Sequence, residues 1–151
     1  MKTILIFCFI IAVVGFGCEK STFQNAPSSL MNTTWVLSYI QDTKTNAIIN
    51  YPSGATKRIS IVFTSSLLYT NSVDEVLFNG ICNGGKGGCT CSTIDGSILV
   101  TGIETTLIAC KFVEWEGYTV QNLDASYGYK IDGVNLIIYS KGSYNLYFTS
   151  N

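Results

Sequence analysis

The residues best suited to chemistry lie in one stretch of the chain, from Phe78 to Cys110. This stretch holds four of the six cysteines and half of the 14 glycines, and the whole chain contains no histidine. Thiols can join in disulfides or bind soft metal ions as thiolates. Disulfide formation and thiolate–metal binding are therefore the two chemistries to weigh first.

The four cysteines of this stretch are Cys82, Cys89, Cys91 and Cys110, and they allow three disulfide pairings. The alternative is a zinc or Cu(I) site, because both ions accept thiolate ligands. The spacing lacks the paired C-x-x-C arrangement of structural zinc sites, and no histidine is available as a further ligand. We therefore predict disulfides, with no metal and no cofactor, and the residues alone do not choose the pairing.

The glycine run from Gly84 to Gly88 is broken only by Lys86 and invites comparison with a phosphate-binding loop. Such a loop ends in Gly-Lys-Ser/Thr and opens a helix, whereas cysteine and threonine follow here. We predict a flexible turn at the surface instead, available for contacts.

A helix is predicted from Thr105–Thr106 to Ala125, and Glu116 is its unusual residue. The apolar side chains of this segment fall on one stripe of about 100° at helical spacing: Ala109, Phe112, Val113, Val120 and Leu123. Glu116 falls in the middle of the stripe, so its carboxylate must be hydrogen-bonded, paired or protonated.

Perturbed buried acids sometimes mark catalytic sites. No nucleophile, histidine or nearby second carboxylate accompanies Glu116, so we predict no catalytic residue and no enzymatic activity. Glu116 is instead expected to tie the helix to backbone N–H groups or a tyrosine hydroxyl of the sheet. Glu116→Gln is then expected to be mild, and replacement by Leu or Ala to be costly in stability.

The first residues of the chain read as a targeting segment. Lys2 precedes an apolar run from Ile4 to Val14, which is typical of a secretory signal and short for a membrane span. The following Gly15 to Cys18 resembles a bacterial lipoprotein box, with glycine where leucine is usual. Residues 1–17 are thus predicted to be a signal peptide, and 18–29 a lipidated N-terminus and tether in which Cys18 carries acyl groups such as palmitate.

Cysteine parity agrees with this interpretation. A mature chain that starts at Cys18 holds five cysteines, and four remain if Cys18 is acylated. An even set in an oxidising compartment indicates disulfides. The predicted location is the bacterial cell envelope, with a lipid anchor in a membrane (such as the outer membrane) and the domain facing the periplasm or the exterior.

Residues 30–151 are long enough for one domain with a real core. The chain is 47% apolar and only 13% charged, which favours strands, and its net charge of -1 excludes the basic field of a nucleic-acid binder. Partners are therefore expected to recognise shape and apolar contact.

Alternation of apolar and polar residues predicts strands along most of the domain. In the first, Trp35, Leu37 and Tyr39 should face the core. Further strands are predicted around Ile59–Phe63, Val73–Asn79 and Ile98–Val100, with a loop or loose hairpin over Gln41–Lys57.

The C-terminal part predicts a three-stranded meander whose first turn is Asp132-Gly133. Its aromatic residues belong either to the core or to a cavity or contact face. Four of them have no predicted side: Tyr127, Tyr139, Tyr144 and Tyr147.

Several short motifs, taken in order, resemble the META (HslJ-like) family of small envelope proteins. They are Trp35-x-Leu37, Gly80-x-Cys82-Asn83, Thr106-x-x-Ala109-Cys110, Glu116 with Val120 and Leu123, and the closing Tyr129-x-Ile131 and Gly133-x-x-Leu136. The likeness spans Leu30 to Phe148. Cys89-Thr90-Cys91 and the long glycine insert depart from it.

The resemblance implies a mainly β (α+β) fold, a compact antiparallel sheet or small barrel with one helix packed across it. It pairs Cys82 with Cys110, which leaves Cys89 and Cys91 to pair across one residue. The competing pairing joins Cys82 to Cys89 and Cys91 to Cys110.

Family members are often envelope lipoproteins linked to stress and secretion. We accordingly expect a non-enzymatic, lipid-anchored protein that acts through contacts with an envelope protein. The alternative is a carrier or sensor of a small apolar ligand between helix and sheet.

Overall fold

The computed structural model describes residues 30–65, 74–92 and 94–151. The predicted signal peptide, Cys18 and the tether lie outside the described residues, as does most of the segment from Ser65 to Asn71. Within the described ranges, no helix combines the length and apolar character needed to cross a membrane.

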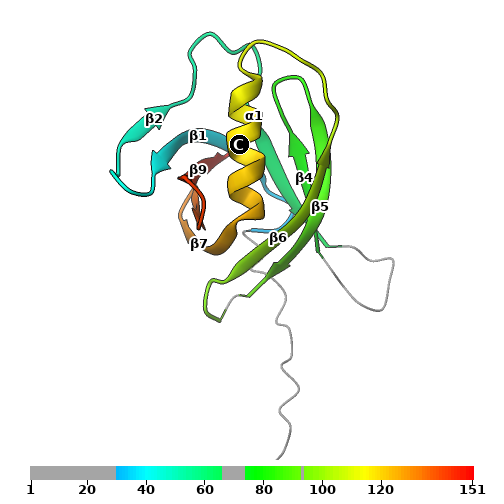
Figure 1. Ribbon diagram of the computed structural model, residues 1–151. Helices are drawn as coiled ribbons and strands as arrows, with labels where there is room; N and C mark the ends of the chain where they lie inside the picture. Colours follow the sequence, from blue (N-terminus) through cyan, green and yellow to red (C-terminus); the bar gives the residue numbers. More distant parts are fainter. Residues whose placement is uncertain (1–29, 66–73, 93) are drawn as a thin grey trace, which may run out of the picture.

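The described chain forms one nine-stranded antiparallel sheet with a single α-helix, α1 (Val113–Asp124), packed across it (Figure 1). In chain order the strands are β1 (Thr34–Asp42), β2 (Ile48–Asn50), β3 (Ser60–Thr64), β4 (Asp74–Asn79), β5 (Gly84–Cys91), β6 (Ile98–Thr105), β7 (Ser126–Asp132), β8 (Asn135–Ser140) and β9 (Tyr144–Ser150). The predicted fold class is confirmed.

The sheet curls until its two edges meet at one end. The strand order is β6-β5-β4-β3-β1-β9-β8-β7, and β2 adds to β1 off this path. The edge strands approach at an isolated bridge between Ser97 and Gly128, where the Tyr129 N–H donates to the Gly96 carbonyl at 2.7 Å. The helix lies across the concave side, with β4 to β6 on one flank and β1 and β9 on the other (Figure 1).

The core occupies the concave side, beneath the helix. Its largest fully buried side chains are Trp35, Phe63, Phe78 and Phe148. Trp35 is thus a core anchor, as predicted, and its indole N–H donates to the Leu30 carbonyl at 3.1 Å.

The first strand departs from the predicted alternation at its centre. Trp35 and Leu37 are buried, but a register shift against β9 between Leu37 and Tyr39 makes Ile40 the next buried residue. The prediction that Tyr39 faces the core is therefore wrong, because the extra residue of the bulge changes which side chains point inward. Tyr39 stacks on Tyr147 instead, with ring centroids 4.4 Å apart.

The glycine run is a strand, which corrects the predicted flexible turn. β5 pairs with β4 on one side and β6 on the other. A Cβ at Gly85 would overlap the Glu104 carbonyl, and one at Gly87 would lie 2.9 Å from the Thr101 carbonyl oxygen. The backbone of β6 approaches so closely that only glycine fits there, which explains a strand built from a poor strand former.

The helix begins later than predicted and faces the core with other residues. β6 continues to Thr105, and the helix starts only at Val113, after Phe112 in the left-handed region with φ of 68°. Ala109 therefore lies in the preceding loop and is exposed. The buried helical residues are Trp115, Glu116, Thr119, Asn122 and Leu123.

The polar members of this buried face are hydrogen-bonded. The Thr119 hydroxyl donates to the Trp115 carbonyl at 2.8 Å. The Asn122 amide oxygen accepts from the Tyr144 N–H at 2.9 Å and from the Ser140 hydroxyl at 3.3 Å. Asn122 thereby joins the C-terminal half of the helix to the turn between β8 and β9.

Candidate functional site

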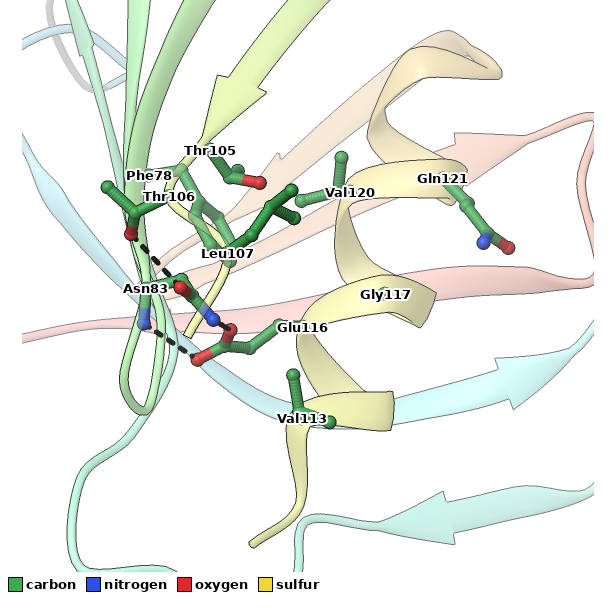
Figure 2. A pocket seen from close by; sticks show the side chains of 10 residues that line it. All are labelled: Phe78, Asn83, Thr105, Thr106, Leu107, Val113, Glu116, Gly117, Val120 and Gln121. Carbon is green, nitrogen blue, oxygen red and sulfur yellow. Dashed lines mark hydrogen bonds between the residues drawn. The ribbon is translucent and has the colours of Figure 1, made fainter. Parts of the chain in front are cut away.

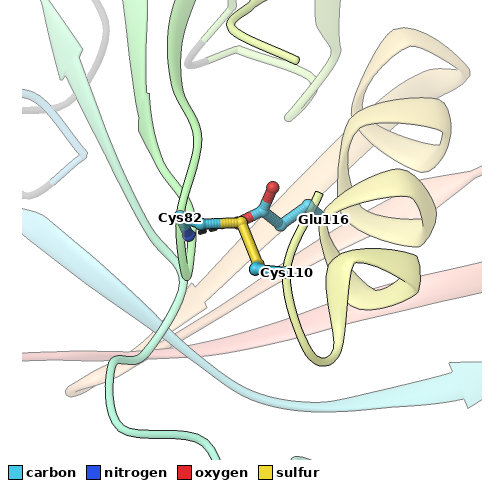
Figure 3. A group of neighbouring side chains, drawn as sticks. All are labelled: Cys82, Cys110 and Glu116. Carbon is cyan, nitrogen blue, oxygen red and sulfur yellow. Dashed lines mark hydrogen bonds between the residues drawn. A yellow bond between two sulfur atoms is a disulfide. The ribbon is translucent and has the colours of Figure 1, made fainter. Parts of the chain in front are cut away.

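Glu116 holds the start of the helix against the sheet. The residue is 5% exposed. Oε1 accepts from the backbone N–H of Cys82 at 2.7 Å (Figure 3). It also accepts from the Asn83 N–H at 3.2 Å, and Oε2 accepts from the Asn83 side-chain amide at 2.6 Å (Figure 2). All three partners are N–H donors, which suits an ionised carboxylate. We call Glu116, Asn83 and the Cys82 N–H the polar clasp.

Asn83 extends the clasp to the loop that precedes the helix. Its Oδ1 accepts from the Ile108 N–H at 2.7 Å and the Thr106 hydroxyl at 3.0 Å, while Nδ2 also donates to the Ile108 carbonyl at 3.0 Å. One buried amide thus fixes both the loop and the helix. Its place in the Gly80-x-Cys82-Asn83 motif was visible in the sequence, but its partners were not.

A disulfide joins the same two segments beside the clasp. Cys82 and Cys110 are bonded, which is the pairing that the family resemblance implies (Figure 3). The competing arrangement, Cys82 with Cys89 and Cys91 with Cys110, is absent. A Cβ at Gly80 would lie against Glu116 Oε1, so the turn that carries Cys82 needs glycine.

The sulfurs of Cys82 and Cys110 lie with a Glu116 oxygen inside a 4.8 Å cluster. Such a cluster resembles a metal-ligand set by distance. The two sulfurs are bonded to each other, however, and only thiolates serve as ligands. The cluster is therefore a covalent and hydrogen-bonded clasp without a ligand set for a metal.

A pocket of about 220 Å³ opens next to the clasp, between the helix and strands β4 and β6 (Figure 2). Its lining residues are Phe78, Asn83, Thr105, Thr106, Leu107, Val113, Glu116, Gly117, Val120 and Gln121. Glu116 is the only acid in the lining, which also lacks cysteine and histidine. The pocket can hold a small apolar group, but it offers no acid–base pair and no activated nucleophile.

Two apolar residues of the lining and the neighbouring Ile108 have exposed side chains. Leu107 is 97% exposed, Ile108 56% and Val113 39%. We call these three residues the apolar rim. Asn83 holds the loop of Leu107 and Ile108 through the Ile108 N–H and carbonyl, and Val113 is the first residue of the helix. The exposed side chains therefore stand on an ordered backbone.

The four tyrosines without a predicted side make aromatic contacts. Tyr144 packs on Tyr118, with ring centroids 5.3 Å apart, at the edge of the core. Tyr127 lies 6.3 Å from Tyr139, and Tyr147 stacks on Tyr39 as described above. None of the four lines the pocket beside the clasp.

Cys89 and Cys91 are free thiols that face the core from β5, so the disulfide expected between them is not formed in this structure. Their sulfurs are 2.9 Å apart. The hydrogen bond to Cys91, together with burial, raises the pKa of the Cys89 thiol well above its usual range.

No family model matches the chain, and no curated protein sequence matches it. Several solved structures are similar to the chain, among them the following two. An NMR structure of a protein from Burkholderia xenovorans aligns with a TM-score of 0.60 and 21% identity, over 81% of this chain and 83% of that one. A crystal structure of a DUF4847 family protein from Bacteroides vulgatus aligns with a TM-score of 0.58 and 12% identity, over 81% and 94%. At these identities the likeness shows the fold alone.

Proposed function

We propose that the chain is a lipid-anchored protein of the bacterial envelope that acts, without catalysis, by binding another envelope protein at the apolar rim. The observation that carries this proposal is the exposure of Leu107 and Ile108 on a loop whose backbone is held in place. Fully burying one such side chain stabilises a complex by about 1.5 to 3 kcal/mol. An ordered loop loses little conformational entropy on binding, so more of this gain remains as affinity.

The location is supported by two features of different kinds. Cys18 follows a segment with the charge and length of a secretory signal. The disulfide between Cys82 and Cys110 suits a compartment outside the cytoplasm, where such bonds persist.

The proposal of a non-catalytic role is supported by how Glu116 is used. Both carboxylate oxygens already accept hydrogen bonds from the segment that carries Cys82 and Asn83. Withdrawing the carboxylate for proton transfer would release the start of the helix from the sheet.

The test of the partner is site-specific photocrosslinking in intact cells. A photoreactive residue at position 107 is expected to give a discrete adduct with one envelope protein. Excess untagged chain should compete with the adduct, whereas excess Leu107→Asp chain should not.

Position 134 is the matched control, because Val134 is 61% exposed in the turn between β7 and β8. The same adduct from position 134 would contradict a specific surface at the rim. A crosslink between two copies of this chain would show that the rim binds a second copy, and it would refute the proposed envelope partner.

The test of the anchor is metabolic labelling with an alkyne fatty acid. We expect label on the protein and its loss in the Cys18→Ala variant. An unlabelled protein that leaves the membrane fraction at high salt would refute the lipid anchor.

The pocket favours a second candidate function, the binding of a small apolar ligand. Its volume of about 220 Å³ falls below the roughly 300 to 1,000 Å³ of ordinary small-molecule sites. It is better matched to a single side chain of a partner, and this places the protein partner first. Native mass spectrometry of protein taken from envelopes checks the second candidate, which predicts a bound mass that Gly117→Leu abolishes.

A further inference from the structure

The two free cysteines stand as neighbours on one face of β5. Cys89 and Cys91 point toward the core and Thr90 points away from it, as strand alternation requires. Cys89 lies opposite Asp74 of β4 and Val100 of β6, and Cys91 lies opposite Ile98. The cysteines are 1% and 6% exposed, and their sulfurs are 2.9 Å apart.

We propose that Cys89 and Cys91 are a site of reversible oxidation, at which a second disulfide forms across Thr90. The geometry is close to what the bond needs. The sulfurs have to move from 2.9 Å to about 2.05 Å, the length of a disulfide. No change of strand pairing is required, because both side chains already converge on the same face.

The same geometry makes this second bond easy to reduce. Residues two apart in a strand have Cα atoms roughly 6.6 to 6.8 Å apart, and disulfides reach only to about 6.8 Å. The bond would therefore form at the upper limit of its range. A disulfide at such a limit is strained and has a more oxidising potential than an unstrained one.

A metal ion explains these residues less well than oxidation. It would require two thiolates in the core, next to Asp74 of the neighbouring strand. The chain has no histidine to complete such a ligand set. A disulfide carries no charge, so it suits an apolar site.

The burial of the two sulfurs assigns them different roles in thiol–disulfide exchange. Cys91 is the more exposed residue, so its thiol first loses its proton to solvent. The resulting thiolate attacks an external disulfide RSSR, forms a mixed disulfide and releases one RS⁻. The Cys89 thiol then gives up its proton and attacks the Cys91 sulfur of the mixed disulfide, releasing the second RS⁻. Two thiols lose two electrons, and RSSR is reduced to two RSH once the thiolates take up protons.

The test uses the purified chain, equilibrated at graded ratios of oxidised to reduced glutathione. The samples are quenched in acid, alkylated under denaturing conditions and digested with trypsin. One tryptic peptide, Gly87–Lys111, contains Cys89, Cys91 and Cys110, whereas Cys82 lies in another peptide. A ring within the peptide is thereby distinguished from the crosslink between Cys82 and Cys110.

As the buffer becomes more oxidising, we expect Cys89 and Cys91 to become resistant to alkylation together. The peptide should then contain a disulfide ring between these two residues. On reduction, this ring should open before the bond between Cys82 and Cys110. Alkylation of both residues at every ratio that keeps Cys82–Cys110 closed would overturn the proposal. So would a mixed disulfide with glutathione that accumulates in the wild type without closing.

Single variants test the assigned roles without deciding the main result, which comes from the wild type. In Cys89→Ala, Cys91 should accumulate a mixed disulfide with glutathione that has no partner to resolve it. In Cys91→Ala, Cys89 should remain a thiol at the same ratios. The reverse pattern would overturn the order of attack.

Discussion

Glu116→Gln is the sharpest test of the polar clasp. All three partners of the carboxylate donate N–H groups, so each needs an acceptor at position 116. Glutamine has one acceptor oxygen and one donor group. Its oxygen can serve the backbone N–H groups of Cys82 and Asn83, but its amide nitrogen then meets the Asn83 amide nitrogen.

Asn83 cannot turn over to relieve this conflict cheaply. Its oxygen already accepts from Thr106 and Ile108, and a flip would forfeit both bonds. The variant therefore loses one charge-assisted hydrogen bond, worth about 1.5 to 3 kcal/mol of unfolding free energy. The mild effect expected from the sequence is thus revised upward. Glu116→Leu leaves all three donors without their acceptor and should lower the free energy of unfolding by about 3 to 5 kcal/mol. The loss is limited to this range because water can reach some of the donors.

The assay is urea unfolding with the disulfide intact, followed by the fluorescence of the two buried tryptophans, Trp35 and Trp115. Glu114→Gln is the control, because this acid is exposed on the same helical turn and should shift the free energy by less than about 0.5 kcal/mol. If Glu116→Gln is as small in effect as Glu114→Gln, the reasoning about donors at the clasp is wrong.

Other predictions concern backbone space, the disulfide and pH. Gly117→Ala should raise the unfolding free energy by about 0.5 to 1 kcal/mol, because its Cβ would meet nothing within 4 Å. Gly85→Ala, measured in the same urea assay, should lower the unfolding free energy. An equal response of the two variants would contradict the close approach of β6 to Gly85. The disulfide between Cys82 and Cys110 closes a loop with a sequence separation of 28. Reducing it should lower the unfolding free energy by about 3 to 4 kcal/mol by the chain-entropy estimate. A Cys82→Ala/Cys110→Ala double variant that unfolds at the wild-type urea concentration would contradict this. Burial raises the pKa of Tyr129 from 10.0 to about 12, so the folded state holds a proton that the unfolded state loses above its own pKa, and stability should fall as pH rises from 10 to 12. Tyr129→Phe should flatten that fall in unfolding experiments at graded pH, and an unchanged slope would refute the assignment.

Alternation predicted strands well wherever one face of the sheet meets the core. Ile61 and Phe63 in β3, and Leu136 and Ile138 in β8, are all fully buried, as their spacing requires. The predicted facing side is wrong from Tyr39 onward in β1, because one bulged residue exchanges the inward and outward positions. No local pattern announces that bulge.

The glycine strand and the helix show a different limit. Glycine is a poor strand former by itself. Gly85 and Gly87 belong in β5 because the backbone of β6, between residues 101 and 105, approaches them too closely for a side chain. The predicted apolar stripe of the helix includes Ala109, but this residue precedes the helix. The burial of Thr119 and Asn122 depends on partners elsewhere in the fold, which periodicity does not contain.

The candidate site was predictable in part. A carboxylate in an apolar stripe drew attention to Glu116, and its hydrogen bonds to backbone N–H groups are of the kind expected. The pocket and the apolar rim were not predictable, because they depend on the path of the loop between β6 and the helix. That path is held by Asn83, whose importance appears only with its partners in place.

The place of β9 in the sheet has a consequence for biosynthesis. This strand closes the described chain, yet it lies in the interior of the sheet, between β1 and β8. Without it, β1 lacks its longest partner, and among the described residues the hairpin of β7 and β8 pairs with the meander from β3 to β6 only at the bridge between Ser97 and Gly128. Long-range pairing of this kind is slow and leaves strand edges open meanwhile. A nascent chain therefore cannot complete this sheet before β9 has been translated.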